Sequence, residues 1–212
     1  AYLTVNTTWQ LLDRDEITAI PIAQAVYHDY ALMYGHWINA HDLETDGGRS
    51  YFAKWGQSFV WGVKSGWGQP EYFTTRENHE LALEEWGHRL GAYQAAKDFL
   101  IYGAMLRQPQ PVAPIPMQTG IKWHKTWSTT YHDVTMPVVL HEAWRSPDGR
   151  VAIVLYNISD QNYRVALDVK NLLKNASGKC NVLYGQPDNA QLKESQLHVK
   201  VPPRQPFVVE LP

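Results

Sequence analysis

Cysteine is almost absent from this sequence, which contains a single one, Cys180. No disulfide can form within the chain, and this neither requires nor excludes secretion. The sequence also lacks an excess of either charge, because 19 Lys and Arg stand against 21 Asp and Glu. The chain therefore offers no field that would attract nucleic acid or an anionic membrane. Apolar runs stay shorter than the roughly 18 residues of a membrane-spanning helix, so we expect no membrane partner.

Several motifs that carry well-known chemistry are also missing. The sequence contains no HExxH or CxxC spacing, so we expect no metal site. It contains no GxSxG elbow of a serine hydrolase, no GxGxxG and no phosphate-binding P-loop. The sequence therefore contains no motif for a bound nucleotide or for a serine nucleophile of this type.

Tryptophan and tyrosine, in contrast, are abundant: there are 9 Trp and 12 Tyr beside only 5 Phe. Both side chains join a large apolar face to a polar edge. That combination suits sugar recognition, in which C–H faces stack on rings and hydroxyl groups seek hydrogen bonds. Burial in a core explains the same composition equally well.

The first half of the chain predicts a mixed α/β structure. The runs 20–29 (IPIAQAVYHD) and 58–63 (SFVWGV) are apolar and short, and we interpret both as buried strands. A long helix is predicted from an N-cap at Thr75 to about Leu106. Charged residues lie largely between its apolar positions, which are Leu83, Trp86, Leu90, Tyr93, Ala96, Leu100 and Ala104.

The second half predicts an antiparallel β-sandwich. Four prolines in residues 108–116 end the helix and indicate a boundary between a domain at 1–110 and a domain at 111–212. The turn sequence SPDG at 146–149 separates two expected strands, of which the second is apolar on both faces and should be central. The expected strands span 137–144, 151–156 and 163–169 and lie near 180–184, 195–201 and 206–211.

The first candidate site is the run Tyr27-His28-Asp29-Tyr30, at the end of the first expected strand. Barrel enzymes place reacting groups at the carboxyl ends of their strands. Asp29 could bind two sugar hydroxyl groups or serve as nucleophile or acid, and His28 could donate a hydrogen bond or tune a carboxylate. Alternatively, Asp29 caps a helix and His28 is satisfied in the core.

The second candidate site surrounds the end of the second expected strand. Trp61 and Trp67 could form a stacking wall, Lys64 lies between them, and Glu71 could be a carboxylate partner for Asp29. A carboxyl separation of about 5 Å would indicate a retaining glycosidase and about 6.5–9.5 Å an inverting one. The alternative is a loop of ordinary surface residues.

Four segments, in order, resemble a group of uncharacterised bacterial glycoside-hydrolase-like proteins: PIAQAVYHDYALMYG, WGQSFVWGVKSGW, FLIYGAMLRQP and AWRSPDGRVAIVLYNISD. The resemblance covers about residues 20–160. It implies the last two strands and final helix of a (β/α)8 barrel, followed by a β-sandwich. It also implies hydrolysis of a glycosidic bond, a reaction that needs no cofactor, and it places His28 and Asp29 in the active site with their roles open. Together with the two candidate sites, it leads us to expect Asp29 as the catalytic residue. The residues expected to bind the substrate are His28, Tyr30, Trp61, Lys64, Trp67 and Glu71.

A whole (β/α)8 barrel needs about 250 residues, so residues 1–110 can supply only part of one. We therefore expect a further barrel portion, on the same or a separate chain, that carries at least one catalytic carboxylate. The expected partner is an oligo- or polysaccharide, and a secreted or periplasmic location is favoured over a cytoplasmic one. The alternative function is non-catalytic carbohydrate binding or scaffolding. Sugar, linkage, anomeric outcome and oligomeric state stay open.

Overall fold

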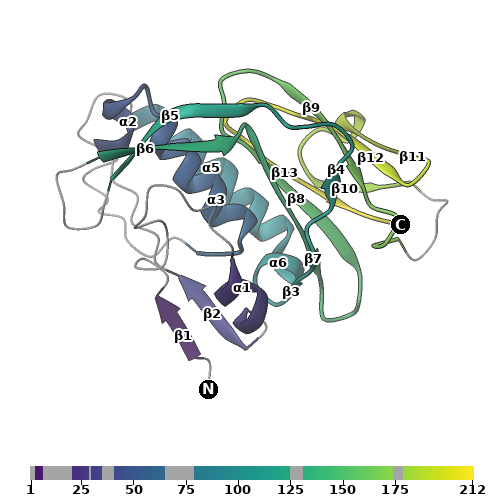
Figure 1. Cartoon of the computed structure of the whole chain (residues 1–212). Coiled ribbons are helices and arrows are strands. Elements are labelled where there is room, and N and C mark those ends of the chain that lie inside the picture. The colour runs from purple at the N-terminus through teal and green to yellow at the C-terminus, as the bar shows by residue number, and fades with distance from the viewer. Residues whose placement is uncertain are drawn as a thin grey trace.

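The computed structural model describes residues 3–6, 21–28, 30–34, 41–64, 79–124, 131–173 and 179–212. Within them a layer of helices covers one face of a five-stranded sheet, and a four-stranded sheet covers the other face (Figure 1). The structure is rich in antiparallel sheet and fits a β-sandwich, as the second half of the sequence predicts.

The five-stranded sheet lies in the middle of the molecule, in the order β10-β13-β8-β7-β3. Every neighbouring pair is antiparallel. β8 occupies the centre, as its two apolar faces predict, and the expected SPDG turn joins it to β7, with Gly149 at φ 86°. The strands are β3 (Ala104–Met105), β7 (Val139–Arg145), β8 (Val151–Asn157), β10 (Asn181–Tyr184) and β13 (Pro206–Glu210).

The four-stranded sheet follows the order β11-β12-β9-β4. Its strands are β4 (Gln110–Pro111), β9 (Tyr163–Asp168), β11 (Ala190–Lys193) and β12 (Gln196–Val201), and a 3-10 helix, η1 (Pro187–Asn189), precedes β11. In β12 buried and more exposed residues alternate, with Leu197, Val199 and Val201 turned inwards. These side chains meet Ile153, Leu155 and other residues of the five-stranded sheet in one core.

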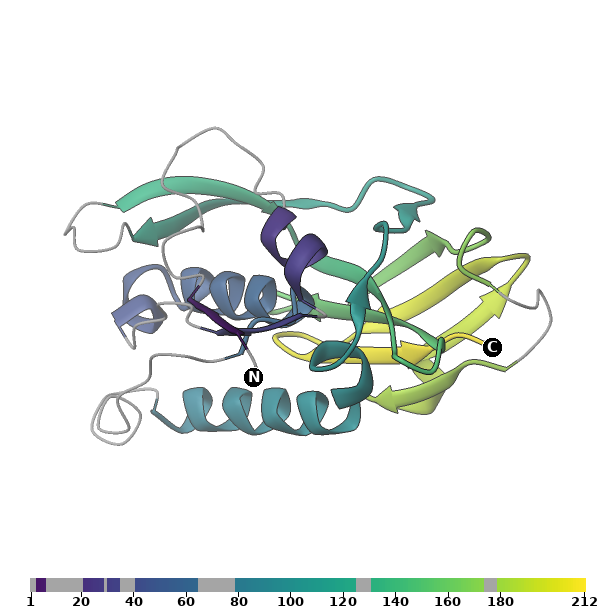
Figure 2. The same ribbon diagram turned by 90° about the horizontal axis from the view of Figure 1, so that it is seen from below.

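The helices are α1 (Ile22–Tyr27), α2 (His41–Thr45), α3 (Arg49–Val60), α5 (His79–Ala95) and α6 (Lys97–Leu100). A hairpin of β5 (Met117–His124) and β6 (Tyr131–Pro137) leaves the sandwich and reaches α2 and α3, as Figure 2 shows. Its attachment includes the backbone N–H of Lys122, which donates to the Asp46 carboxylate at 2.9 Å. Among the described residues, no helix is long and apolar enough to cross a membrane.

Both strands expected in the first half are helical. The run 20–29 contains α1, and 58–63 contains the end of α3 and the turn that follows it. A short apolar run does not show whether a buried segment is a strand or a helix. This ambiguity applies to α3, because all of its residues from Ser50 onwards are buried. Before residue 100, the strands in the described part of the chain are β1 (Leu3–Asn6) and β2 (Ala31–Tyr34).

The expected long helix is divided and turns an unexpected face inwards. The segment forms two helices, α5 and α6, and the second ends at Leu100 rather than near Leu106. The predicted N-cap, Thr75, lies outside the described residues. Glu85 and Arg89 are 2% and 1% exposed, while Leu83 and Leu90 are 45% and 58% exposed. The predicted apolar face is therefore wrong at these positions.

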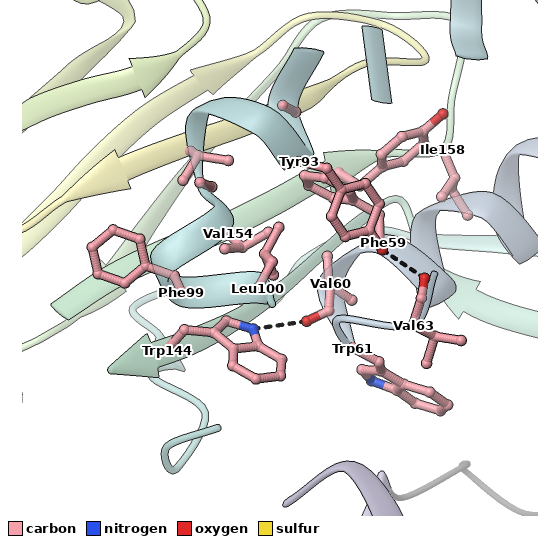
Figure 3. Close-up of a cluster of buried hydrophobic side chains, with 14 of the residues drawn as sticks. Phe59, Val60, Trp61, Val63, Tyr93, Phe99, Leu100, Trp144, Val154 and Ile158 are labelled. Atoms are coloured by element: carbon pink, nitrogen blue, oxygen red, sulfur yellow. Dashed lines mark hydrogen bonds between the residues drawn. The ribbon is translucent and has the colours of Figure 1, made fainter. Parts of the chain in front are cut away.

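A second core joins the helices to the five-stranded sheet (Figure 3). It combines Phe59 and Val60 of α3 and Phe99 and Leu100 of α6 with residues of the sheet such as Val154. The side chains therefore come from both sides of residue 110. The division into domains 1–110 and 111–212 stays a prediction.

Candidate functional site

The candidate site is built around a parallel pair of strands. β1 and β2 pair in parallel, with Leu3 opposite Ala31 and Asn6 opposite Tyr34. Parallel neighbours cannot be joined by a tight turn and need a crossover connection, commonly a helix. Here the connection contains α1, which begins after Pro21, a residue whose fixed φ suits a helix start. β1, α1 and β2 thus follow the β-α-β pattern.

His28, at the C-terminal end of α1, ties this unit to the rest of the molecule. It is 4% exposed, its Nδ1 lies 2.9 Å from the Gly103 carbonyl oxygen, and its Nε2 lies 3.2 Å from that of Gly62. The ring also meets the edge of Trp144, on β7, at a centroid distance of 4.5 Å. One side chain therefore links α1 to the turn after α3, the turn before β3 and the five-stranded sheet.

Both ring nitrogens of His28 are committed to backbone acceptors. A neutral imidazole carries one N–H, so it donates to one carbonyl group and turns a lone pair towards the other, whereas the imidazolium donates to both. Burial lowers the pKa of His28, and the hydrogen bonds to Gly103 and Gly62 oppose this shift. Because neither nitrogen points to a free partner, His28 acts as an anchor in this structure.

A buried carboxyl group lies on the helix-facing side of β7. Glu142 is 6% exposed, and Gln108 Nε2 lies 3.4 Å from its Oε1. Burial raises the pKa of Glu142 to about 8, and hydrogen bonding with Trp61 opposes the rise. At pH 7 this carboxyl group is largely protonated, which is the state of a general acid, but its burial keeps it from bulk solvent.

The tryptophans near the site belong to the core. Trp61 is 5% exposed and Trp144 is 0% exposed, and Trp144 Nε1 donates to the Val60 carbonyl oxygen at 2.9 Å (Figure 3). Trp55 and Trp123 are also buried, and Trp86 is half-buried. For the tryptophans that the structure describes, burial accounts for the unusual composition.

The structure brings some of the predicted site residues together. His28 and Trp61 flank the turn at Gly62, and Lys64 follows it, half-buried, with a pKa that burial lowers. Tyr30, beyond the anchored His28, is 74% exposed. Asp29, Trp67 and Glu71 lie outside the described residues, so their roles stay predictions.

One argument for the first candidate site has to be corrected. The sequence predicts the run Tyr27-His28-Asp29-Tyr30 at the carboxyl end of a strand, but Tyr27 is the last residue of α1, His28 is its C-cap and Tyr30 precedes β2. In (β/α) enzymes the binding groups cluster at the carboxyl ends, which for β1 and β2 are at Asn6 and Tyr34. The role of Asp29 therefore rests on the family resemblance.

Two groups near His28 and Trp61 were not predicted from the sequence: the Glu142 carboxyl group and the Gly103 carbonyl group. Glu142 carries a signal, since an acidic residue inside the apolar run 137–144 needs a buried partner. The carbonyl group of Gly103 carries none, because any residue can supply one. Within the described part of the chain, no group of three or more His, Cys, Asp or Glu side chains could hold a metal ion.

No protein-family model matches the sequence, and no curated protein matches it. Among solved structures, the GH51 arabinofuranosidase from Xanthomonas axonopodis pv. citri is similar over 58% of this chain and 26% of its own, with 13% identity and a TM-score of 0.35. The noncanonic maltogenic alpha-amylase AmyB from Thermotoga neapolitana is similar over 81% and 38%, with 18% identity and a TM-score of 0.42. A debranching enzyme from Nostoc punctiforme is similar over 79% and 32%, with 12% identity and a TM-score of 0.38.

The chain thus spans well under half of the length of each of these proteins. The TM-scores are too low to establish a shared fold, so the similarity carries no argument about the structure or activity of this chain.

Proposed function

We propose that this chain is the C-terminal portion of a glycoside hydrolase, contributing part of the sugar-binding pocket. The observation that carries the proposal is the parallel pairing of β1 and β2 with α1 in their connection. This β-α-β unit is the repeating element of a (β/α)8 barrel. An antiparallel sandwich follows it, in the order that the family resemblance implies.

The proposed reaction is hydrolysis of a glycosidic bond by a pair of carboxyl groups. Asp29 supplies one, and Glu71 or a residue of another barrel portion supplies the second. Tyr30, Lys64 and Trp67 bind the sugar. His28 and Trp61, which are buried, position the segments that carry these groups.

The proposed partner, besides the saccharide, is the remaining part of the barrel. A two-stranded parallel sheet leaves strand edges that further strands can pair with, and parallel sheets need cover on both faces. In keeping with this, α1 exposes Ile22, Val26 and Tyr27 at 64%, 50% and 55%. An apolar helix face of this kind suits a neighbouring βα unit.

The test uses the full gene product, including any residues that the gene encodes before or after residues 1–212. It is incubated with a panel of oligosaccharides, and newly formed reducing ends and bound saccharide are measured in parallel. Release of reducing ends supports the proposal. Binding of a saccharide without release identifies the alternative, a non-catalytic carbohydrate-binding protein.

A further inference from the structure

A buried acid, Glu85, lies on the face of α5 that packs on the five-stranded sheet. Glu85 Oε1 accepts a hydrogen bond from the Tyr156 hydroxyl, on β8, at 2.8 Å. Its second oxygen, Oε2, is buried and has no hydrogen-bond partner among the described residues. A buried carboxylate with one unpaired oxygen is costly, whereas the protonated acid is much less so.

The polar groups around Glu85 come from α5 itself, from α3, from β8 and from the segment before β13. Arg89, one turn further along α5, is 1% exposed, and its guanidinium lies 3.1 Å from the centre of the Trp55 ring on α3. Tyr51 of α3 is fully buried, and its hydroxyl group has no hydrogen-bond partner in the described part of the chain. The carbonyl oxygen of Arg204, before β13, lies 3.4 Å from the Tyr156 hydroxyl.

Close packing leaves this cluster little room to rearrange. A Cβ added to Gly56 of α3 would lie 2.6 Å from the Tyr156 ring, so helix and strand already touch there. The polar groups of α3 and α5 therefore cannot move towards solvent unless a helix shifts on the sheet. When Glu85 ionises, either a helix shifts on the sheet or the buried charge stays in place and destabilises the folded protein.

We propose that Glu85 is a proton-binding site that holds α5 on β8 when protonated and loosens α5 when ionised. Burial raises the pKa of this carboxyl group to about 7, while Arg89 and the Tyr156 hydrogen bond oppose the rise. The folded pKa lies above the reference value of 4.5. The stabilisation from the bound proton is therefore complete below pH 4.5 and is lost as the pH rises to about 7.

The experiment compares thermal unfolding from pH 4.5 to 8.5 in a Glu142→Gln background, because Glu142 also titrates above its ordinary range. Glu85→Gln keeps the acceptor for Tyr156 and cannot ionise. We expect the gain in Tm from Glu85→Gln to grow from pH 4.5 to about 7 and then level off. Glu80→Gln, at an exposed position of the same helix, is the control and should give a difference that changes little with pH. A constant difference for Glu85→Gln as well would overturn the proposal.

Two further measurements keep the test decisive if Glu85→Gln does not fold. The first is the carbon-13 titration of the glutamate carboxyl groups in the Glu142→Gln protein, with hydrogen exchange of α5 followed in parallel. We expect one midpoint near 7, with α5 exchange rising over the same range after correction for intrinsic rates. The second is Tyr156→Phe, which removes a donor to the ionised form and should move that midpoint to higher pH. A midpoint near 4.5, or exchange of α5 that ignores it, would contradict the proposal.

Discussion

Gly62 and His28 are in such close contact that a Cβ on Gly62 would lie 2.5 Å from His28 Nε2. Gly62 also has φ 65°, which L side chains rarely adopt. Only glycine fits the turn that joins α3 to the chain beyond it while His28 keeps its hydrogen bond to the Gly62 carbonyl group.

Gly62→Ala should therefore destabilise the protein by about 2–4 kcal/mol, through backbone strain and overpacking against His28 and Trp144. Urea unfolding measures the change. Gly87→Ala is the control, since a Cβ there meets nothing within 4 Å. In the middle of α5 the added methyl group should stabilise by about 0.5–1 kcal/mol. Equal effects of the two substitutions would refute the contact.

The Glu142 carboxyl group should make stability fall as the pH rises. Its folded pKa of about 8 lies above the reference value of 4.5, so its contribution is complete below 4.5 and is lost by about 8. Replacing Glu142 by Gln should remove a loss on the order of 5 kcal/mol. The interval from pH 7 to 8 is most informative, because at least about half of Glu85 is already ionised there. If the free energy of unfolding changes equally with pH in wild type and in Glu142→Gln over this interval, this assignment is contradicted.

A buried ion pair joins α2 to α3. Lys54 Nζ lies 2.8 Å from both carboxylate oxygens of Asp42, and the two side chains are 2% and 1% exposed. Lys54→Met leaves a buried carboxylate without its cation and should cost about 3–5 kcal/mol. Lys170→Met, which breaks the exposed pair with Asp168, should cost less than about 1 kcal/mol. Chemical denaturation of both variants checks the ranking, and a reversed order would be inconsistent with it.

The division at residue 110 predicts that residues 112–212 fold alone and that residues 1–110 do not. Removing the helices would uncover Trp144, Val154 and Tyr156 on the five-stranded sheet. We therefore expect isolated 112–212 to unfold cooperatively but to bind a hydrophobic dye. A cooperative thermal transition of isolated 1–110 would contradict the claim that this part does not fold alone.

The sandwich could be predicted from sequence because its signals are local. The turn at 146–149 and the two-faced apolar run of β8 specify the hairpin and the central position without knowledge of distant residues. The strand β9 shows the same in its alternation of apolar and polar side chains.

The helical half depended on distant partners. Glu85 can be buried because the Tyr156 hydroxyl donates a hydrogen bond to it, and Arg89 because its guanidinium packs on the Trp55 ring. Neither partner is near them in sequence. The run 20–29 could be strand or helix by its apolar pattern, and its place in the fold is set by the contacts of His28 with Gly62 and Gly103. Of the candidate site, the burial of His28 was one of two interpretations that the sequence left open, but its backbone partners Gly62 and Gly103 could not be predicted.

The most direct test of the central claim is the rate of reducing-end release by the full gene product and by its Asp29→Asn variant, on an oligosaccharide that the wild type cleaves. If Asp29 is a catalytic carboxylate, the variant loses at least about a hundredfold in turnover while its Tm stays nearly unchanged. Undiminished release by Asp29→Asn would contradict the claim that the glycosidase site includes Asp29.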